Sequence, residues 1–458
     1  MIINRFFHSI LFWGAWIIIP VIMEILPALG GGLLLISRRR KQKRKMRKAV
    51  KLKNFPGLTL IIPVYNSEET LFNCVRSVAE STYPSDALRI YLVNNQGKDN
   101  SFAIYSQCQE AFPQLKMQWL NSKQGKSRAL NLALYNSDGK YIINLDSDGQ
   151  LEPHALEYMV TRFENDTSIN CMTGAVLTDP GLIKKYKKFF PRLLRNLEFM
   201  EYAQAFLAGR SYASETDKVY TLSGAFSAFR KSAILKSRLY NTNTICEDTQ
   251  ITFQMRYIQK EKVEVCEDAI FFVDPIEDMN KLYTQRQRWQ RGSLEVAKQF
   301  LDKKKNFGRN FLDVNVHTLL YDHTFAFPRL IWYVALFCLV FMNYSTSLII
   351  LSTGVIFLLY ILVGFVYFAI VNYYLKEFTE IKSYYQKHWW VVFLLPFFNF
   401  LVFFIRFAGV VNSINTDSAW KTRNFTEEKE AFGQVVREDF KKPLKKILEI
   451  KKYVNGES

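Results

Sequence analysis

The sequence has little of the chemistry that binds soft metals or builds disulfide scaffolds. Its 458 residues include 6 cysteines and 5 histidines, and neither set shows the spacing of a metal-binding motif. No internal repeat or low-complexity segment is visible. A zinc centre built from cysteine and histidine is therefore excluded, and we expect the cysteines to be free thiols in the cytosol.

Apolar and basic residues are in excess, and both are unevenly placed. Hydrophobic residues make up 49% of the chain, with 38 Phe and 24 Tyr, and they concentrate near the two ends. The formal net charge is +18, but the basic residues between Arg38 and Lys48 directly follow a long apolar run. This placement indicates the cytoplasmic flank of a membrane helix facing anionic lipid rather than a nucleic-acid surface. We therefore expect membrane lipids, and no nucleic acid, among the partners.

The apolar run at 10–36 is long enough to cross a bilayer, which takes about 20 residues. It is longer than the apolar region of a signal peptide and has no small-residue cleavage site. Pro20, Pro27 and Gly30–Gly32 predict that this helix is kinked or broken. Glu24 lies inside the run, where an acid facing lipid is costly. It either makes a polar contact inside a helix bundle or lines a passage for product.

Composition divides the chain into five parts. We expect a transmembrane helix with a basic flank at 1–50, an α/β domain at 51–278, amphipathic interface helices at 279–324, membrane helices at 325–411 and a cytoplasmic tail at 412–458. A mixed-charge helix is expected near 426–452 in that tail. The basic and aromatic stretch at 182–212 is either an amphipathic segment near the membrane surface or a solvated helix face.

Three apolar blocks follow the α/β domain, at 325–342, 346–371 and 388–411. The first two are expected to span the membrane and the third to lie in the interface or re-enter, since it holds Pro396 and Arg406. This arrangement keeps the tail in the cytoplasm. Three spans would instead place the tail outside.

Short apolar runs alternate with helical segments between 57 and 275. Strands are expected at Leu58–Val64, Leu88–Val93, Met117–Leu120 and Tyr141–Leu145, with helices near 100–112 and 125–135. Such alternation predicts an α/β domain with a mostly parallel sheet and helices on both faces. Ser67 is expected to cap a helix that carries Glu68 and Glu69 in its first turn.

Two carboxylates follow the buried strand Tyr141–Leu145, at the place where ligands bind in open α/β sheets. Asp146 and Asp148 are one residue apart, and Gly149 then allows a sharp turn. Paired hard oxygens at such a place suit Mg²⁺ or Mn²⁺, whose other ligands come from a substrate's phosphates. A solvated acidic turn is the alternative for an Asp-x-Asp taken alone.

Three further segments follow in a fixed order. Lys126 comes directly after Gly125 at a predicted helix start, where a cation can cradle a diphosphate. Glu247-Asp248 opens a helix, and a carboxylate there can take the proton of an attacking hydroxyl. The segment Gln285-Arg-Gln-Arg-Trp289 offers a forked guanidinium for a diphosphate and a flat ring for a sugar. Taken singly, these segments are also what ordinary helix starts and basic helices contain.

In this order, the segments resemble glycosyltransferase family 2 over about 57–295, and in particular its membrane-embedded polysaccharide synthases. These include the poly-N-acetylglucosamine, hyaluronan, chitin and cellulose synthases; a likeness to the exosortase-associated glycosyltransferases of Gram-positive bacteria is a further candidate. The resemblance implies a GT-A-type, Rossmann-like nucleotide-sugar domain that uses Mg²⁺ or Mn²⁺. It also implies inverting transfer from a UDP-sugar, with UDP-N-acetylglucosamine as the first expectation and UDP-glucose as the second.

The resemblance assigns roles to individual residues of this chain. It implies nucleotide contacts at Pro63, Tyr65, Asn94, Asn95, Lys126, Asp146, Arg288, Trp420 and Arg423, the last two in a gating loop. It implies metal ligation by Asp146 and Asp148, a catalytic base at Asp248 beside Glu247, and acceptor contacts at Gly224, Phe226, Arg230, Gln285 and Trp289. The pair Asn94-Asn95 departs from the family, which usually places an acid there to accept the uracil N3–H bond.

The leading hypothesis is a multi-pass glycosyltransferase of a bacterial plasma membrane with its catalytic domain in the cytoplasm. It would extend a cell-surface polysaccharide processively and couple extension to export. Expected partners are a UDP-sugar donor, a glycan or lipid-linked acceptor, membrane lipids, and export or accessory membrane proteins. One alternative is a single addition to a lipid or polyprenyl phosphate. Another is a non-catalytic scaffold for glycan export, which only Asn94-Asn95 supports.

Overall fold

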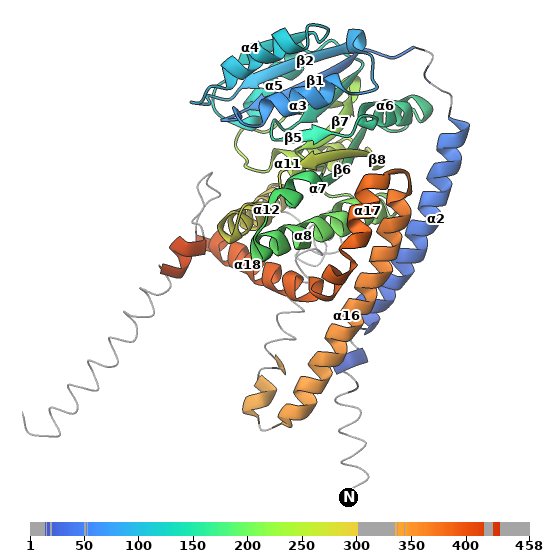
Figure 1. Ribbon diagram of the computed structural model, residues 1–458, viewed down its shortest axis with the longest axis vertical. Helices are drawn as coiled ribbons and strands as arrows, with labels where there is room; N and C mark the ends of the chain where they lie inside the picture. Colours follow the sequence, from blue (N-terminus) through green and yellow to red (C-terminus); the bar gives the residue numbers. More distant parts are fainter. Residues whose placement is uncertain are drawn as a thin grey trace, which may run out of the picture.

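The computed structural model describes residues 21–49, 54–300 and 344–415, together with residues 14, 16–18, 52, 335–336, 338–342 and 425–430. The strands are β1 (Leu58–Val64), β2 (Leu88–Asn94), β3 (Met117–Asn121), β4 (Tyr141–Leu145), β5 (Gly149–Leu151), β6 (Cys171–Thr178), β7 (Phe226–Arg230) and β8 (Val263–Val273). They form one eight-stranded sheet in the order β3-β2-β1-β4-β7-β6-β8-β5. Figure 1 shows this sheet at one end of the molecule, with long helices extending away from it.

The helices of the α/β domain are α3 (Leu71–Ala79), α4 (Ser101–Ala111), α5 (Lys126–Asn136), α6 (Ala155–Asn165), α7 (Pro180–Lys185), α8 (Phe189–Tyr202), α9 (Arg210–Glu215), α10 (Lys231–Ile234) and α11 (Glu247–Phe253). Outside it are α2 (Leu26–Lys48), α12 (Met279–Phe300), α16 (Thr346–Tyr374), α17 (Thr379–Lys387) and α18 (Leu395–Asn415). Single turns of 3₁₀-helix form η2 (Ser85–Ala87), η5 (Leu375–Glu377) and η6 (Trp389–Phe393), and π-helical turns form η1 (Val21–Ile25), η3 (Ala203–Gly209) and η4 (Gln254–Ile258).

The predicted α/β fold class is confirmed, and each of the four predicted strands is present. β1, β2, β3 and β4 pair in parallel, because helices connect them on either face of the sheet. The sheet is mixed rather than parallel throughout, since β7 runs antiparallel to both β4 and β6, and β5 runs antiparallel to β8. Because β7 is reversed, its first residues rather than its last lie at the edge formed by the carboxyl ends of β1 and β4.

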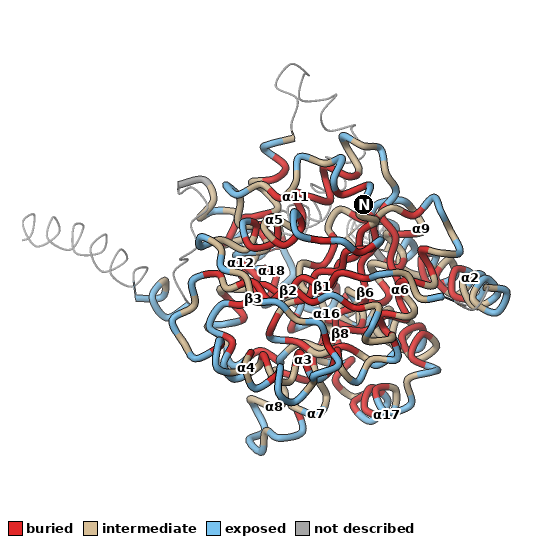
Figure 2. The backbone as a smooth tube through the Cα atoms, turned by 90° about the horizontal axis from the view of Figure 1, so that it is seen from above, coloured by how far each residue is buried: buried red, intermediate tan, exposed pale blue. Residues whose placement is uncertain are grey.

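The core lies in two layers, one on each face of the sheet. Along β1, Leu60 and Ile62 pack on the face covered by α3 and α6, while Ile61 packs on the face covered by α5 and α11. This alternation follows from the two-residue period of a strand. All seven residues of β1 are buried, as are all five of β4. Figure 2 shows the buried strands at the centre of the molecule.

The predicted cap at Ser67 is wrong, and so is the predicted start of its helix. α3 begins at Leu71, and no acidic residue lies in its first turn. The Ser67 hydroxyl is engaged elsewhere: its Oγ lies 2.7 Å from Ser147 Oγ and accepts the N–H of Tyr65 at 3.3 Å. Ser67 therefore ties the loop after β1 to the loop that carries the two aspartates.

α2 continues without a break through Gly30–Gly32 and through the basic cluster, so the prediction of a helix broken at the glycines is wrong. The irregularity lies earlier, in the π-helical turn η1, and Pro27 fits the first turn of α2. Gly31 and Gly32 are buried, and a Cβ at Gly32 would lie 3.0 Å from Ile370 of α16. The glycines thus allow two helices to approach closely. The side chain of Glu24 lies outside the described residues.

Two helices in the described part of the chain are long and apolar enough to cross a membrane, Thr346–Glu377 and Leu395–Ser413. The first contains α16 and matches the predicted span at 346–371. The second lies within α18, which crosses α16 rather than lying along it (Figure 1) and packs on α12. Most of the block at 325–342 lies outside the described residues. The number of spans therefore stays a prediction.

The basic cluster was predicted to face lipid or water, but Arg38 and Arg39 do not. Both side chains are 1% exposed and lie against β8. Arg39 pairs with Asp268 at 2.6 Å, and Arg38 pairs with Glu215 at 2.9 Å. These arginines are buried because folding of the α/β domain places a set of buried carboxylates against α2.

Glu267 lies at the centre of this set, and its side chain is fully buried. It pairs with Arg162 at 2.9 Å and lies 3.8 Å from both Arg38 and Arg39. Although burial alone raises the pKa of Glu267, the guanidinium groups of Arg162, Arg38 and Arg39 outweigh it and lower the pKa to about 2. The carboxylate therefore joins α2 to α6 and β8 electrostatically.

We predict that Glu267→Gln lowers the free energy of unfolding by about 3–5 kcal/mol, because three buried guanidinium groups lose their shared carboxylate. Thermal unfolding of the purified chain in detergent measures this. Glu80→Gln is the matched control, since its 3.9 Å pair with Arg76 is exposed and contributes about 0.5 kcal/mol or less. Equal losses in the two variants would contradict the prediction.

The same carboxylate should govern stability in acid. Its folded pKa of about 2 lies below the ordinary 4.5, so its stabilising contribution is present above pH 4.5 and disappears as pH falls toward 2. We expect the wild type to lose more stability than Glu267→Gln over that interval. Unfolding midpoints measured across the interval test this, and parallel acid limbs would be the opposing result.

Candidate active site

The two predicted metal ligands lie at the carboxyl edge of the sheet. Asp146 directly follows β4, and its N–H donates to the carbonyl of Ala225 at 3.2 Å. Asp148 comes just before Gly149, which opens β5. A Cβ at Gly149 would lie 2.3 Å from the ring of Phe271, so only glycine fits this turn. The turn holds both carboxylates on the same short loop.

Lys126 contacts Asp146 and also residues of the other predicted segments. Its Nζ lies 2.5 Å from Asp146 Oδ1 and 3.4 Å from Glu247 Oε1. The same ammonium donates to the carbonyl of Gly224 at 3.2 Å. Segments from four separate places in the sequence therefore meet at one cation, as their assignment to one site requires.

Asp248 joins this cluster through Gly224. Its Oδ2 accepts the N–H of Gly224 at 3.2 Å, and its Oδ1 accepts the N–H of Thr249 at 2.6 Å. A Cβ at Gly224 would lie 3.2 Å from that Oδ2 and 3.3 Å from Lys126 Nζ. Gly224 therefore sits between the cation and the carboxylate, and a larger residue would displace one or both. The arrangement fixes the Asp248 carboxylate at the start of α11.

Glu247 lies beside Asp248 but is more enclosed, with 12% of its side chain exposed. Burial raises its pKa; Asp248 adds to the rise, and Lys126 opposes it. Lys126 therefore favours the charged form of Glu247.

The environment of Asp148 fits a divalent cation. Although its side chain is open to solvent on one side, burial and the charge of Asp146 raise its pKa to about 6, with Lys126 opposing the rise. Closely spaced carboxylates are hard-oxygen donors that a cation stabilises. Within the described residues no group of three His, Cys, Asp or Glu is placed to hold a metal. A cation held by Asp146 and Asp148 would take its other ligands from phosphates or water.

The two asparagines at the end of β2 have different roles. Asn95 is buried, and its Oδ1 accepts the N–H of Gly125 at 2.5 Å. Gly125 has a φ of +128°, which glycine adopts at low cost, and Lys126 follows it directly. Asn95 therefore shapes the loop that presents Lys126. Asn94 donates to Asn121 Oδ1 at 3.1 Å and stays partly open to solvent.

Of the two predicted nucleotide contacts near the end of β1, one is accessible. Tyr65 lies just beyond the strand and is 40% exposed. Pro63 is buried within β1, so its side chain is not open to solvent, and its contact with the nucleotide stays a prediction. The apolar strand pattern takes Pro63 into the core before the chain reaches the edge of the sheet.

α12 carries the segment from Gln285 to Trp289 and packs on the start of α11. A Cβ at Gly292 would lie 2.2 Å from Cys246 Sγ, so the two helices touch where Glu247 begins α11. Burial raises the pKa of the Cys246 thiol, and the positive charge of Arg288 opposes this rise. Exposed Arg288 therefore lies close enough to influence the acidic end of the cluster.

Arg286 was not among the residues selected from the sequence, but it lies in contact with two of them. It is 1% exposed and pairs with Glu201 at 2.5 Å. Its guanidinium lies 4.4 Å from the centre of the Trp289 ring, and its NH1 donates to Gln285 Oε1 at 3.2 Å. Arg286 thus holds two of the predicted acceptor residues, and its partner Glu201 comes from α8, 85 residues earlier.

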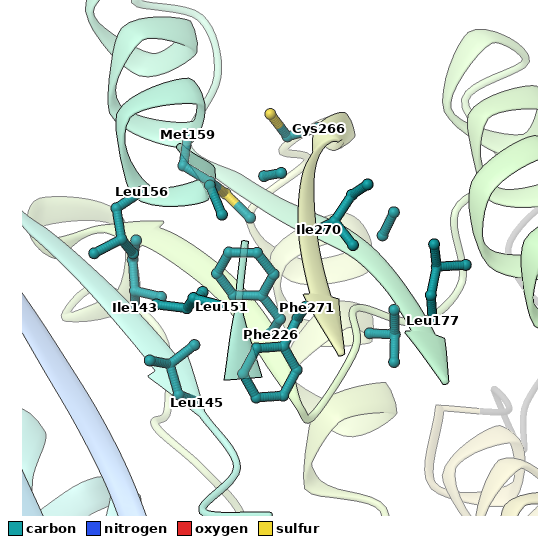
Figure 3. Packing of buried hydrophobic residues seen from close by; sticks show 14 of the residues in the cluster. Ile143, Leu145, Leu151, Leu156, Met159, Leu177, Phe226, Cys266, Ile270 and Phe271 are labelled. Carbon is teal, nitrogen blue, oxygen red and sulfur yellow. The ribbon is translucent and has the colours of Figure 1, made fainter. Parts of the chain in front are cut away.

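Two predicted acceptor residues lie away from the cluster, and their assignment is wrong. Phe226 is fully buried in the core against Phe271, as Figure 3 shows. Arg230 is opposite Tyr141, at the other end of β4 from Asp146, and donates to the carbonyl of Ile169 at 2.7 Å. Because β7 is antiparallel, its last residue Arg230 lies at the far end of β4; Phe226 lies at the near end, but its side chain points into the core.

Trp420 and Arg423, the predicted gating-loop residues, lie outside the described residues. The segment that follows them packs on the start of α12. Phe425 lies 5.4 Å from the ring of Tyr283, and the hydroxyl of Thr426 bonds Asn280 Oδ1 at 3.1 Å. The predicted tail helix is present over 425–430.

Comparisons with known proteins agree with this geometry. The family profile described as Glycosyl transferase family 2 matches residues 59–237. A poly-beta-1,6-N-acetyl-D-glucosamine synthase of Staphylococcus aureus (strain COL) is 25% identical over 294 residues, covering 64% of this chain and 66% of that protein. The probable glycosyltransferase YdaM of Bacillus subtilis (strain 168) is 28% identical over 253 residues, covering 55% of this chain and 58% of that protein. Each match spans slightly under two thirds of the relative, or less.

A solved structure supports the fold. The mannosyltransferase PcManGT from Pyrobaculum calidifontis, in complex with GDP-Man and Mn²⁺, superposes with a TM-score of 0.53 at 17% identity. The superposition covers 82% of this chain and 96% of that chain. At this identity the likeness concerns the fold, a Rossmann-type sheet of the GT-A kind. With the family profile and the relatives, it agrees with the resemblance that the motifs predicted: residues 59–237 form a glycosyltransferase family 2 domain.

Proposed function

We propose that this protein is an inverting membrane glycosyltransferase that transfers a sugar from a UDP-activated donor to a growing cell-surface polysaccharide. The observation that carries the proposal is the convergence of Asp146, Glu247, Asp248 and Gly224 on Lys126. UDP-N-acetylglucosamine is the first candidate donor, in keeping with the poly-N-acetylglucosamine synthase among the relatives, and UDP-glucose is the second.

Each residue of the cluster has a chemical task in this proposal. Asp248 takes the proton of the acceptor hydroxyl as the oxygen attacks the anomeric carbon from the side opposite the nucleotide. Lys126 and Arg288 balance the negative charge of the departing diphosphate. Mg²⁺ or Mn²⁺ held by Asp146 and Asp148 would supply further charge neutralisation at the same phosphates. Trp289, fixed by Arg286, offers a flat face to the acceptor sugar.

The protein is proposed to lie in a bacterial plasma membrane with this cluster on the cytoplasmic side. α16 is the clearest span. Its Tyr374 end is fixed to α2 by the Arg39 guanidinium, which donates to the Tyr374 carbonyl at 3.1 Å. The contact of Phe425 with Tyr283 supports a tail on the same side as α12. Protease accessibility of the tail in inside-out vesicles tests this topology; a protected tail would favour three spans.

Membranes containing the full chain can be incubated with UDP-N-acetylglucosamine, UDP-glucose and GDP-mannose in turn, with Mg²⁺ or Mn²⁺. Mass spectrometry of the products identifies the sugar that is transferred. A ladder of lengths would support polymer extension, and one added sugar on a lipid or polyprenyl phosphate would support the single-addition alternative. No transfer from any sugar nucleotide, with no calorimetric signal for UDP and metal, would favour the scaffold.

We predict that Asp248→Asn lowers kcat by roughly 10²–10⁴-fold, the usual contribution of a general base, while nucleotide affinity stays within a few-fold of wild type. An amide cannot take the acceptor proton, but the segments expected to hold the donor are unchanged. Calorimetry with UDP and a turnover assay measure the two effects. Asp86→Asn, on an exposed turn, is the matched control. Retained turnover in Asp248→Asn would remove the assignment of the base.

Gly224→Ala should lower kcat by about 10–100-fold without unfolding the domain. Its new Cβ would press on Asp248 and Lys126, at 3.2 and 3.3 Å, and move both out of alignment. Gly57→Ala serves as the control, because its Cβ would meet nothing closer than 3.8 Å. Steady-state kinetics together with thermal unfolding separate misalignment from instability. A fully active Gly224→Ala enzyme would refute the close packing of this site.

Arg286→Gln should reduce sugar transfer more than it reduces hydrolysis of the donor by water. Trp289 loses the guanidinium that fixes its ring, while Lys126 and Asp248 keep their contacts. Because Glu201 would be left without its ion pair, Arg286→Gln with Glu201→Gln is the neutral companion variant. UDP release, measured with and without acceptor, gives the ratio. A proportional loss of both activities in both variants would indicate a purely structural role.

A further inference from the structure

A basic and aromatic surface lies where α7 gives way to α8, outside the candidate active site. Phe189 and Phe190 are 64% and 78% exposed, and their rings are 5.4 Å apart. Four exposed lysines precede them, namely Lys184, Lys185, Lys187 and Lys188. We call these six residues the α7–α8 surface. Two large exposed aromatic rings beside each other are costly in water, so their placement needs an explanation.

Among the described residues, no carboxylate lies within 4.0 Å of any of these four lysines. The ammonium of Lys184 instead lies 5.5 Å from the ring centre of Tyr384 on α17. This differs from Lys43, Lys126 and Lys140, each of which has an acidic partner. The surface therefore carries four ammonium groups without an ion pair among the described residues, although Lys185 acts at longer range on Asp274.

α17 and η6 extend this surface with the same chemistry. His388 is buried against Tyr384, at 4.3 Å between ring centres, and exposed Lys387 precedes it. Burial lowers the pKa of His388, and the positive charges of Arg192, Lys387 and Lys184 lower it further. Cations from α7, α8 and α17 thus face one another across His388. Figure 2 shows these three helices along one edge of the molecule.

The position of the surface along α16 is fixed by Trp389. This side chain is 52% exposed, and its ring lies 6.5 Å from that of Phe365 on the apolar helix α16. Tyr374, at the end of α16, is where the helix meets the catalytic domain. The α7–α8 surface therefore lies at the depth where the proposed membrane span ends, at the side of the catalytic domain.

We propose that the α7–α8 surface docks on the anionic phospholipid headgroups of the membrane leaflet that faces the catalytic domain. Lysine ammonium groups meet the lipid phosphates, and Phe189 and Phe190 enter the adjacent acyl region together with Trp389. Charge complementarity selects anionic over zwitterionic headgroups, because a zwitterionic leaflet offers no net charge to the four lysines of this surface. The proposal rests on the membrane placement proposed above and not on the transfer reaction.

This contact would reach the catalytic site through a single helix. α8 begins at Phe189 and ends at Tyr202, and it carries Glu201, the partner of Arg286. Lipid binding at the Phe189 end of α8 therefore affects Glu201 at the other end, and through it Arg286, which fixes Trp289.

The test uses the full chain, purified in a neutral detergent and titrated with phosphatidylglycerol or phosphatidylcholine. Native mass spectrometry counts the bound lipids. We expect the wild type to retain phosphatidylglycerol preferentially. Lys184→Gln, Lys187→Gln and Lys188→Gln together should weaken its binding roughly a hundredfold, at about fivefold per charge. The matched control removes three exposed lysines from the catalytic domain, Lys116→Gln, Lys236→Gln and Lys260→Gln, and should retain the preference.

A second variant, Phe189→Ser with Phe190→Ser, keeps every charge and should also weaken phosphatidylglycerol binding. Unchanged binding in both test variants, or equal losses in the lysine variant and its control, would overturn the proposal. Displacement of the lipid by inorganic phosphate at equal concentration would indicate a free-anion site and would also overturn it. A chain washed out of membranes by alkaline carbonate would instead contradict the membrane placement. A chain that resists washing but shows no lipid preference would contradict this surface alone.

Discussion

The fold depends on a buried ionic contact between the helix α2 and the sheet. Buried charges are costly unless they are paired, and here Arg38, Arg39 and Arg162 share Glu267 and its neighbour Asp268. Such a contact is specific in position, because a shift of α2 by one residue would bury a charge without a partner. The apolar faces of α2 and α16 could slide on each other, but the arginines cannot. The contact therefore sets the position of the helices relative to the catalytic domain.

The position of β8 also determines where α12, which carries predicted acceptor residues, begins. The segment that joins β8 to α12 is held by α8: Ile276 N–H donates to Glu198 at 2.7 Å, and Arg195 donates to the carbonyl of Glu277 at 2.6 Å. Burial raises the pKa of Glu198 to about 7, and the Ile276 N–H opposes the rise. α12 thus leaves the sheet in a fixed direction. Trp289 and Arg288 are placed by the same elements that anchor the helices.

How much of this was predictable depends on the sequence distance over which each interaction acts. The strands were predictable because a run of apolar residues by itself indicates a buried strand. The position of the acids after β4 was predictable because the end of a strand can be recognised from neighbouring residues. The burial of Arg38 was not, since its carbonyl partner at Val265 is 227 positions away. Arg230 was misassigned because a linear motif does not reveal that its strand runs antiparallel, and Phe226 because the motif does not reveal which face of the strand is buried. Arg286 is a variable position within its motif, so no pattern selected it.

The charge of the site limits how a donor can bind. Asp146, Asp148, Glu247 and Asp248 crowd around a single ammonium, so the cluster repels a second anion such as a nucleotide diphosphate. Lys126 cannot serve the diphosphate fully while it also neutralises Asp146 and Glu247. Donor binding therefore has to be coupled to positive charge brought in beside Asp146 and Asp148, or to release of Lys126 from them. Either route makes nucleotide affinity depend on the loop that Asn95 holds through Gly125.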